Sequence, residues 1–154
     1  MADPLLTGRV RWSHAETVET SADPNVVWRL WTDFRSRDGW DDIEWARLDG
    51  PLEVGTKGQW KPSFMPTQKV WIERVEPGAA FTVAATHAAA LGVLHYHHEL
   101  EPRRDGTTLV THRLELTGRL APVIGRFAGR KMAKELPEVL RRLVASAGAT
   151  PEDG

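Results

Sequence analysis

Apolar and polar residues alternate along the first part of the chain, from residue 9 to residue 20. Alternate side chains of a β-strand point to opposite faces, so this pattern predicts a long first strand over Arg9–Thr20. One predicted face is the more apolar of the two, and we expect it to point into the protein. That face carries Val10, Trp12, His14, Glu16 and Val18.

A helix is predicted directly after this strand. Asp23 belongs to the residue types that cap helices, and Pro24 suits the first helical position. Apolar residues then follow at the spacing of one buried helical face. They are Val27, Leu30, Trp31 and Phe34. The polar segment 35–42 contains Gly39, and we predict a turn or a short second helix there.

Short strands separated by turn residues follow up to residue 116. The predicted ranges are 44–48, 58–61, 69–76, 80–86, 93–101 and 107–116. Asp105 and Gly106 form a strong hairpin signal between the last two strands. Contiguous strands without helical crossovers pair into an antiparallel sheet.

From Leu120 the apolar period becomes helical and predicts a long C-terminal helix. Its opposite, basic side is interpreted as a solvated face. Gly125 and Gly129 are one turn apart, so we expect another element to pack closely there. Pro137 is expected to kink or break the helix because it lacks a backbone donor. The order of elements predicts an α+β domain in which a curved antiparallel sheet of about seven strands wraps on this helix.

Composition narrows the class of protein. A length of 154 residues fits one domain, and we expect an N-terminal tail over 1–8, a domain over 9–147 and a C-terminal tail over 148–154. The chain has no cysteine, which excludes disulfides and thiolate catalysis and fits a cytoplasmic protein.

Charge and motifs exclude further classes. Twenty Lys and Arg residues nearly balance 21 Asp and Glu residues, so we expect no nucleic-acid partner. The longest small-apolar stretch, 88–94, is too short for membrane insertion. The chain contains no glycine-rich phosphate loop and no serine-centred nucleophile elbow. We therefore predict no cofactor.

Five segments carry a family resemblance through their order and spacing. They are T-S-A-D-P-N-V-V-W-R-L-W-T-D (20–33), L-D-G-P-L-E-V-G-T (48–56), R-V-E-P-G-A-A-F (74–81), H-E-L-E-P-R-R-D-G-T-T-L-V-T-H (98–112) and L-T-G-R-L-A (116–121). The chain resembles the SRPBCC superfamily of START-like proteins, especially its polyketide cyclase/dehydrase-like branch. The resemblance implies a helix-grip fold with a cavity between sheet and C-terminal helix. It further implies a small hydrophobic ligand, polyketide-like or lipid-like.

Strand alternation and the resemblance together select the candidate ligand-binding residues. They are Trp12, His14, Glu16, Trp60, Phe64, Met65, Phe81, Leu94, Tyr96, His98, His112, Leu114 and Phe127. Phe64 and Met65 lie in the segment 61–68, between two prolines. This segment is either an adaptable apolar gate over the cavity or a plain surface loop.

A polar cluster is expected on the inward strand faces. It comprises His14, Glu16, Tyr96, His98 and His112. Buried polar groups need hydrogen-bond partners, so these residues either form a structural network or face a ligand. In an enzyme, His98 or His112 would act as the base, Tyr96 or the second histidine as the donor, and Glu16 would orient a histidine.

His95, His97 and Glu99 share the other face of the same predicted strand. Two imidazoles and a carboxylate at this spacing suit zinc or iron. Alternation, however, places them on the outside of the sheet, where nothing would enclose a metal. We interpret them as a solvated polar stripe and predict no metal site.

Two functions follow from these observations. The first is a binding module that carries or senses a hydrophobic metabolite, as a monomer or homodimer. The alternative is a polyketide cyclase or dehydratase type of enzyme that uses inward His and Tyr residues as acid–base groups. A protein-interaction role is less favoured because the sequence indicates no clear exposed apolar patch.

Overall fold

The computed structural model describes residues 9–34, 41–88 and 91–149. Their elements follow the predicted order of strand, helix, six strands and long helix. The elements are β1 (Trp12–Thr20), α1 (Pro24–Thr32), β2 (Ile43–Leu48), β3 (Lys57–Pro62), β4 (Gln68–Glu76), β5 (Ala80–Thr86), β6 (Val93–Pro102), β7 (Thr108–Thr117), α2 (Ala121–Ile124), η1 (Gly125–Gly129) and α3 (Arg130–Ala149). The predicted strand boundaries are nearly right, except that β1 begins at Trp12 rather than Arg9.

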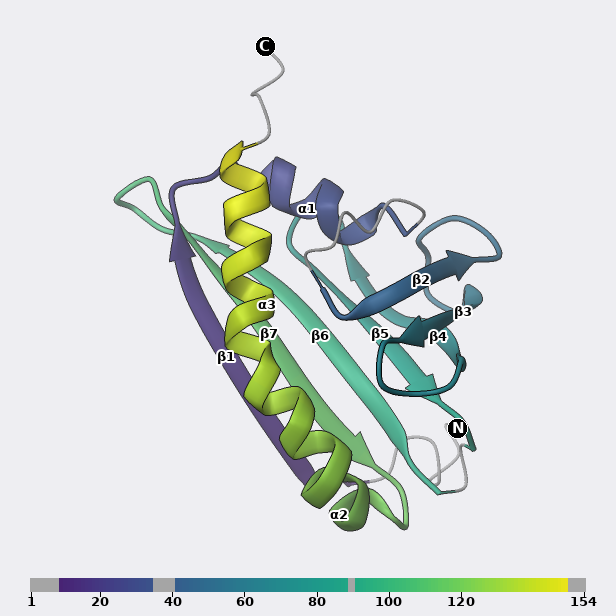
Figure 1. The fold of residues 1–154 in the computed structure, drawn as a ribbon. Helices are drawn as coiled ribbons and strands as arrows, with labels where there is room; N and C mark the ends of the chain where they lie inside the picture. The colour runs from purple at the N-terminus through teal and green to yellow at the C-terminus, as the bar shows by residue number, and fades with distance from the viewer. Residues whose placement is uncertain (1–8, 35–40, 89–90, 150–154) are drawn as a thin grey trace.

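One seven-stranded sheet holds all of these strands, in the order β1-β7-β6-β5-β4-β3-β2. Every neighbouring pair is antiparallel. Figure 1 shows the sheet curving around α3, which crosses its inner face beside β1 and β7. The structure therefore confirms the predicted helix-grip fold.

The two faces of the central strands follow the predicted alternation. Along β7, the inner residues Val110, His112, Leu114 and Leu116 are almost fully buried, whereas Arg113 between them is exposed. This burial against α1 and α3 supplies the main favourable free energy of the fold.

Helix α1 begins as the sequence predicts. Asp23 caps it by accepting a hydrogen bond from the Asn25 amide at 2.8 Å, and Pro24 takes the first position. Trp31 packs edge-on against Phe81 of β5, with ring centroids 6.0 Å apart. Helix α1 thus fills one end of the space between the sheet and α3 with large aromatic side chains.

The C-terminal helix departs from regular α-helical hydrogen bonding before Pro137 and not at it. Pro137 does not break it, because α3 continues without interruption from Arg130 to Ala149. The irregular turn is η1, a π-helical turn in which the Arg130 amide donates to the Gly125 carbonyl. Trp12 lies directly on this turn, and a Cβ on Gly125 or Gly129 would overlap its indole. The expected close packing at the two glycines is therefore the contact with Trp12.

The turn between β6 and β7 forms at the predicted Asp-Gly pair. Gly106 has a φ of 88°, in the left-handed region that glycine adopts without strain. The side chain and amide of Thr107 donate to the Asp105 carboxylate, which lowers the pKa of Asp105. These local bonds hold the hairpin closed.

Some predictions fall on other parts of the chain. The predicted tail over 1–8, residues 35–40 of the predicted turn or short helix, and residues 150–154 of the predicted C-terminal tail lie outside the described residues. Among the helices that the structure does describe, none combines the length and the apolar character needed to span a membrane.

Candidate ligand cavity

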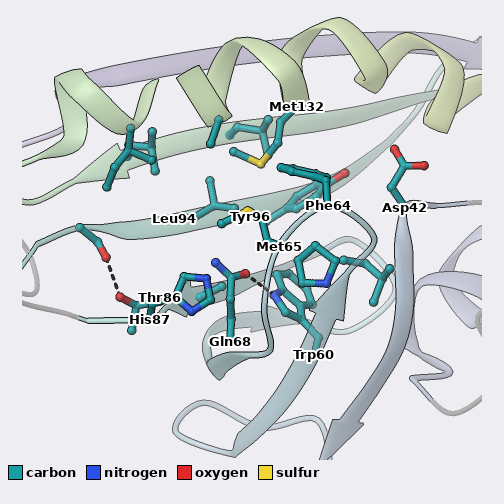
Figure 2. Close-up of a pocket in the computed structure, with 18 of the residues that line it drawn as sticks. Asp42, Trp60, Phe64, Met65, Gln68, Thr86, His87, Leu94, Tyr96 and Met132 are labelled. Atoms are coloured by element: carbon teal, nitrogen blue, oxygen red, sulfur yellow. Dashed lines mark hydrogen bonds between the residues drawn. The ribbon is translucent and has the colours of Figure 1, made fainter. Parts of the chain in front are cut away.

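A cavity of about 430 Å³ lies between the inner face of the sheet and the start of the C-terminal helix. Its walls come from β2 to β7, from α2, η1 and α3, and from the loop between β3 and β4 (Figure 2). Most of the wall is aliphatic or aromatic, with side chains such as Leu94, Leu114, Leu116, Leu136 and Val139. A space of this size and character matches small-molecule sites in general.

The predicted gate segment, residues 61–68, forms one wall of this cavity. Phe64 and Met65 both line it and are half-buried, and Figure 2 shows them between the helix and the sheet. The ammonium group of Lys131 lies 5.1 Å from the centroid of the Phe64 ring, in cation–π range. This loop therefore contacts the helix across the cavity instead of standing clear of it.

The mouth of the cavity carries four exposed apolar side chains: Leu91, Leu120, Val123 and Phe127. Phe127 is the most exposed of them, at 70%, and the Arg126 guanidinium lies 6.0 Å from its ring centroid. The expectation of no clear exposed apolar patch is therefore wrong. Residues far apart in sequence meet here only because the turn before β6 lies beside α2 and η1.

A chain of three side chains leads from the aromatic core to the cavity wall. The Trp31 indole Nε1 donates to Nε2 of His112 at 2.9 Å. Because this nitrogen accepts, a neutral His112 carries its hydrogen on Nδ1 and donates it to the Tyr96 hydroxyl, 2.8 Å away. His112 is 0% exposed, whereas Tyr96 lines the cavity. The partners therefore hold His112 as one neutral tautomer.

His98 also reaches the cavity, but as part of an aromatic stack. Its ring lies parallel to Phe81 on one side and to Tyr96 on the other, with centroid distances of 4.2 and 4.4 Å. The imidazole is 4% exposed. Stacking on both faces fixes the ring plane and leaves only its edge for polar contacts.

A second tryptophan supports the opposite side of the cavity. The Trp60 indole Nε1 donates to Oε1 of Gln68 at 2.8 Å, and both residues line the cavity. Trp60 is in β3 and Gln68 begins β4, so this bond closes the base of the 61–68 loop.

Three acidic residues, Asp41, Asp42 and Glu135, are among the described residues that line the cavity, and two of them pair with cations from outside its lining. Asp42 is paired with Arg142 at 3.1 Å, and Glu135 is paired with Lys131 at 2.9 Å. No Lys or Arg is among the described residues that line the cavity. The electrostatic environment therefore favours a neutral occupant over an anion.

The structure brings together eight of the thirteen candidate ligand-binding residues. The cavity is lined by Trp60, Phe64, Met65, Leu94, Tyr96, His98, Leu114 and Phe127. The remaining five, which are Trp12, His14, Glu16, Phe81 and His112, do not line it.

The residues outside the cavity lie on the inner side of the sheet as predicted, but each is either covered by another element or stands at the sheet edge. Trp12 is covered by η1. His14 and Glu16 hydrogen-bond to each other at 2.9 Å on the edge strand β1, each about one-third exposed. Phe81 and His112 are covered by Trp31 of α1. The expected five-residue polar cluster is thus divided: Glu16 stands opposite His112 in the register of β1 and β7, but its carboxylate hydrogen-bonds to His14.

The outer histidines of β6 lie on the predicted face, but they are paired. His95 contacts the Glu73 carboxylate at 2.5 Å and the Thr117 hydroxyl at 2.8 Å. His97 contacts Glu115 at 2.5 Å, together with the hydroxyl of a threonine on β5 at 2.8 Å. This face is therefore less solvated than expected. Within the described residues, no group of three or more His, Asp or Glu side chains is arranged to hold a metal ion.

Several cavity residues were not among the candidates. Gln68 is the most informative: it shares the inner face of β4 with the buried Val70 and Ile72, so alternation extended by one residue would have found it. Met132 and Leu136 belong to the apolar stripe of the C-terminal helix. Asp42 had no sequence signal, because only the folded β2 edge brings it to the cavity.

The comparisons with known proteins agree with this fold. The family model described as "Polyketide cyclase / dehydrase and lipid transport" matches residues 11–148. A search of curated proteins gave no significant match.

Solved structures with the same fold are distant in sequence. A hypothetical protein from Helicobacter pylori superimposes with a TM-score of 0.74 at 15% identity, covering 94% of this chain and 92% of that one. Norcoclaurine synthase from Thalictrum flavum, in complex with dopamine and hydroxybenzaldehyde, gives 0.69 at 11% identity, with 92% and 89% covered. A START superfamily protein from Mycobacterium smegmatis gives 0.65 at 12% identity, with 88% and 97% covered. At these identities the likeness establishes the fold alone.

Proposed function

The chain belongs to the polyketide cyclase/dehydrase and lipid-transport family, and we propose that it binds a small, largely hydrophobic molecule of polyketide-like or lipid-like character. The observation that carries this proposal is the apolar cavity of about 430 Å³ between sheet and helix. Natural cores are packed with few voids larger than a water molecule. An open volume of this size in a packed domain is the property expected of a binding protein.

The alternative of a cyclase or dehydratase needs an acid–base group that reaches the ligand. His112 does not meet this condition, because it is buried behind the cavity wall and its Nε2 already accepts from Trp31. Tyr96 and His98 do line the cavity. Their presence is equally compatible with binding alone, so binding is the function we propose.

A narrowed cavity tests this proposal directly. Ala85 is buried on β5 and lines the cavity, so Ala85→Leu places a larger side chain inside it. We expect the variant to bind the neutral fluorescent probe Nile red at least about tenfold more weakly, a loss of about 1.4 kcal/mol. Ala145→Leu makes the same chemical change on the exposed side of α3 and should leave binding unchanged.

Fluorescence titration measures the affinities, and circular dichroism with thermal melting confirms that both variants fold. If Ala85→Leu does not fold, Ala128→Leu narrows the cavity from the helix side. Absence of probe binding by the unaltered protein, or equal binding by the narrowed and control variants, would contradict the proposal. Native mass spectrometry of the purified protein then identifies any small molecule that copurifies.

A further inference from the structure

The hydrogen bond between Trp60 and Gln68 has a fixed direction. An indole N–H can donate but cannot accept, so Gln68 must present its amide oxygen to Trp60, at 2.8 Å. The amide nitrogen, with two hydrogens, is therefore held on the other side of the Gln68 side chain. Figure 2 shows this nitrogen turned away from the Trp60 indole. Trp60 thus determines which end of the amide is offered elsewhere.

The position of Gln68 makes this orientation relevant to a ligand. Gln68 is 6% exposed, lines the cavity and stands opposite mainly apolar walls. In the described part of the chain, its side chain hydrogen-bonds to Trp60 alone. A buried amide donor is costly without an acceptor. An occupant that supplies an acceptor to Nε2 is therefore favoured over one that cannot.

Two hydroxyl groups that line the cavity already have a hydrogen-bond partner within the protein. The Thr86 hydroxyl donates to the Gly92 carbonyl at 2.6 Å, and the Tyr96 hydroxyl accepts from Nδ1 of His112. The cavity carboxylates of Asp42 and Glu135 are neutralised by cations outside it. Because the described lining contains no Lys or Arg, an ionised carboxylate on the ligand would find no permanent counter-charge there.

We infer that the cavity selects neutral ligands that carry a carbonyl-type hydrogen-bond acceptor, seated on Nε2 of Gln68. Trp60 is the positioning residue that holds the amide in the donating orientation. This inference rests on the proposed binding function and deepens it, because it names the polar group of the ligand. It further separates neutral ketones, esters and lactones from fatty-acid carboxylates.

A pair of probes tests the inference: fluorenone and fluorene share a ring system and differ in one carbonyl group. Isothermal titration calorimetry gives both dissociation constants, and their ratio removes most of the shared hydrophobic contribution. The fluorene dissociation constant divided by that of fluorenone should be about tenfold larger for the unaltered protein than for Gln68→Met. A factor of this size corresponds to the net strength of one hydrogen bond. Fluorene carboxylate should bind more weakly than either.

Two further variants separate the orientation of the Gln68 amide from the mere presence of a glutamine. Trp60→Phe keeps an apolar ring but frees the amide, so the preference for fluorenone should fall by about threefold although Gln68 is unchanged. Gln59→Met is the matched control. Gln59 lies directly before Trp60 on β3 and hydrogen-bonds to Arg47 instead of lining the cavity. That control should retain the full preference.

Infrared spectroscopy reports the hydrogen bond itself. The carbonyl stretch of fluorenone bound to the unaltered protein should lie below its position in hexane, and it should return towards that position in Trp60→Phe. A hexane-like stretch in the unaltered protein, or a fluorenone preference unaffected by both cavity variants, overturns the inference while cavity binding stands. Failure of both probes to bind overturns the proposed function as well. If Gln68→Met does not fold, the infrared comparison with Trp60→Phe decides.

Discussion

The two faces of β6 place histidines in opposite chemical settings. On the inner face, His98 is stacked between two aromatic rings, and the neighbouring His112 of β7 accepts from an indole. On the outer face, His95 and His97 each contact a carboxylate at 2.5 Å and a threonine hydroxyl at 2.8 Å. The same residue type thus meets neutral partners inside and charged partners outside.

The difference decides which protonation states each face tolerates. A carboxylate only accepts, and a hydroxyl can accept or donate, so an outer imidazole keeps both of its bonds whether neutral or protonated. His112 loses the bond from Trp31 if Nε2 takes up a proton. The inner network is therefore committed to a single proton arrangement, whereas the outer pairs are not. A polar network inside a core is most specific when each member has one role.

The largest expected effect comes from removing the central member of the inner network. His112→Ala leaves a void and removes the partner of the Trp31 indole and of the Tyr96 hydroxyl. We expect the free energy of unfolding to fall by about 3 kcal/mol. His97→Ala, its counterpart on the outer face, should cost about 1 kcal/mol because water can solvate its partners. Urea denaturation of both variants measures the difference, and equal losses would remove the contrast between the faces.

An intermediate effect is expected when the hydrogen bond that fixes the tautomer of His112 is removed. Trp31→Phe keeps an aromatic ring but removes the donor to His112, and should lower the free energy of unfolding by about 1.5 kcal/mol. Heteronuclear NMR of the ring nitrogens should show His112 as the Nδ1–H tautomer in the unaltered protein. In the variant, the Nε2–H form should become populated. Finding the Nε2–H form before substitution would show that the proposed direction is wrong.

The smallest effect is expected on the outer face. Glu115→Gln keeps an oxygen that can accept from His97 and removes only the charge of a partly exposed pair, so we expect a loss of about 0.5 kcal/mol. The contribution of this charge should shrink further when salt is added. Urea denaturation at low and high salt checks both statements. A loss larger than that of Trp31→Phe would reverse the comparison.

The sequence predicted the fold well because its signals are local. Alternation assigned the inner faces of β6 and β7 correctly, and Asp23 and Pro24 marked the start of α1. The prediction was weaker where two elements compete for one space. Nothing local indicates that η1 covers Trp12, so its assignment to the cavity wall did not match the structure. Pro137 was expected to kink or break the helix; the break does not occur, because one missing hydrogen bond does not end a helix that packs along its length.

By itself, the sequence determined which side chains face inward, since the two-residue period of a strand and the helical period of α3 are properties of the backbone. Only the tertiary structure decided which inward residues share the cavity. Trp31 reaches His112 from 81 positions away, and Trp60 orients Gln68 from the neighbouring strand. Packing of α1 and α3 on the sheet fills one end of the enclosed space and leaves the other open. That division depends on side-chain volumes meeting across the fold, which no local pattern records.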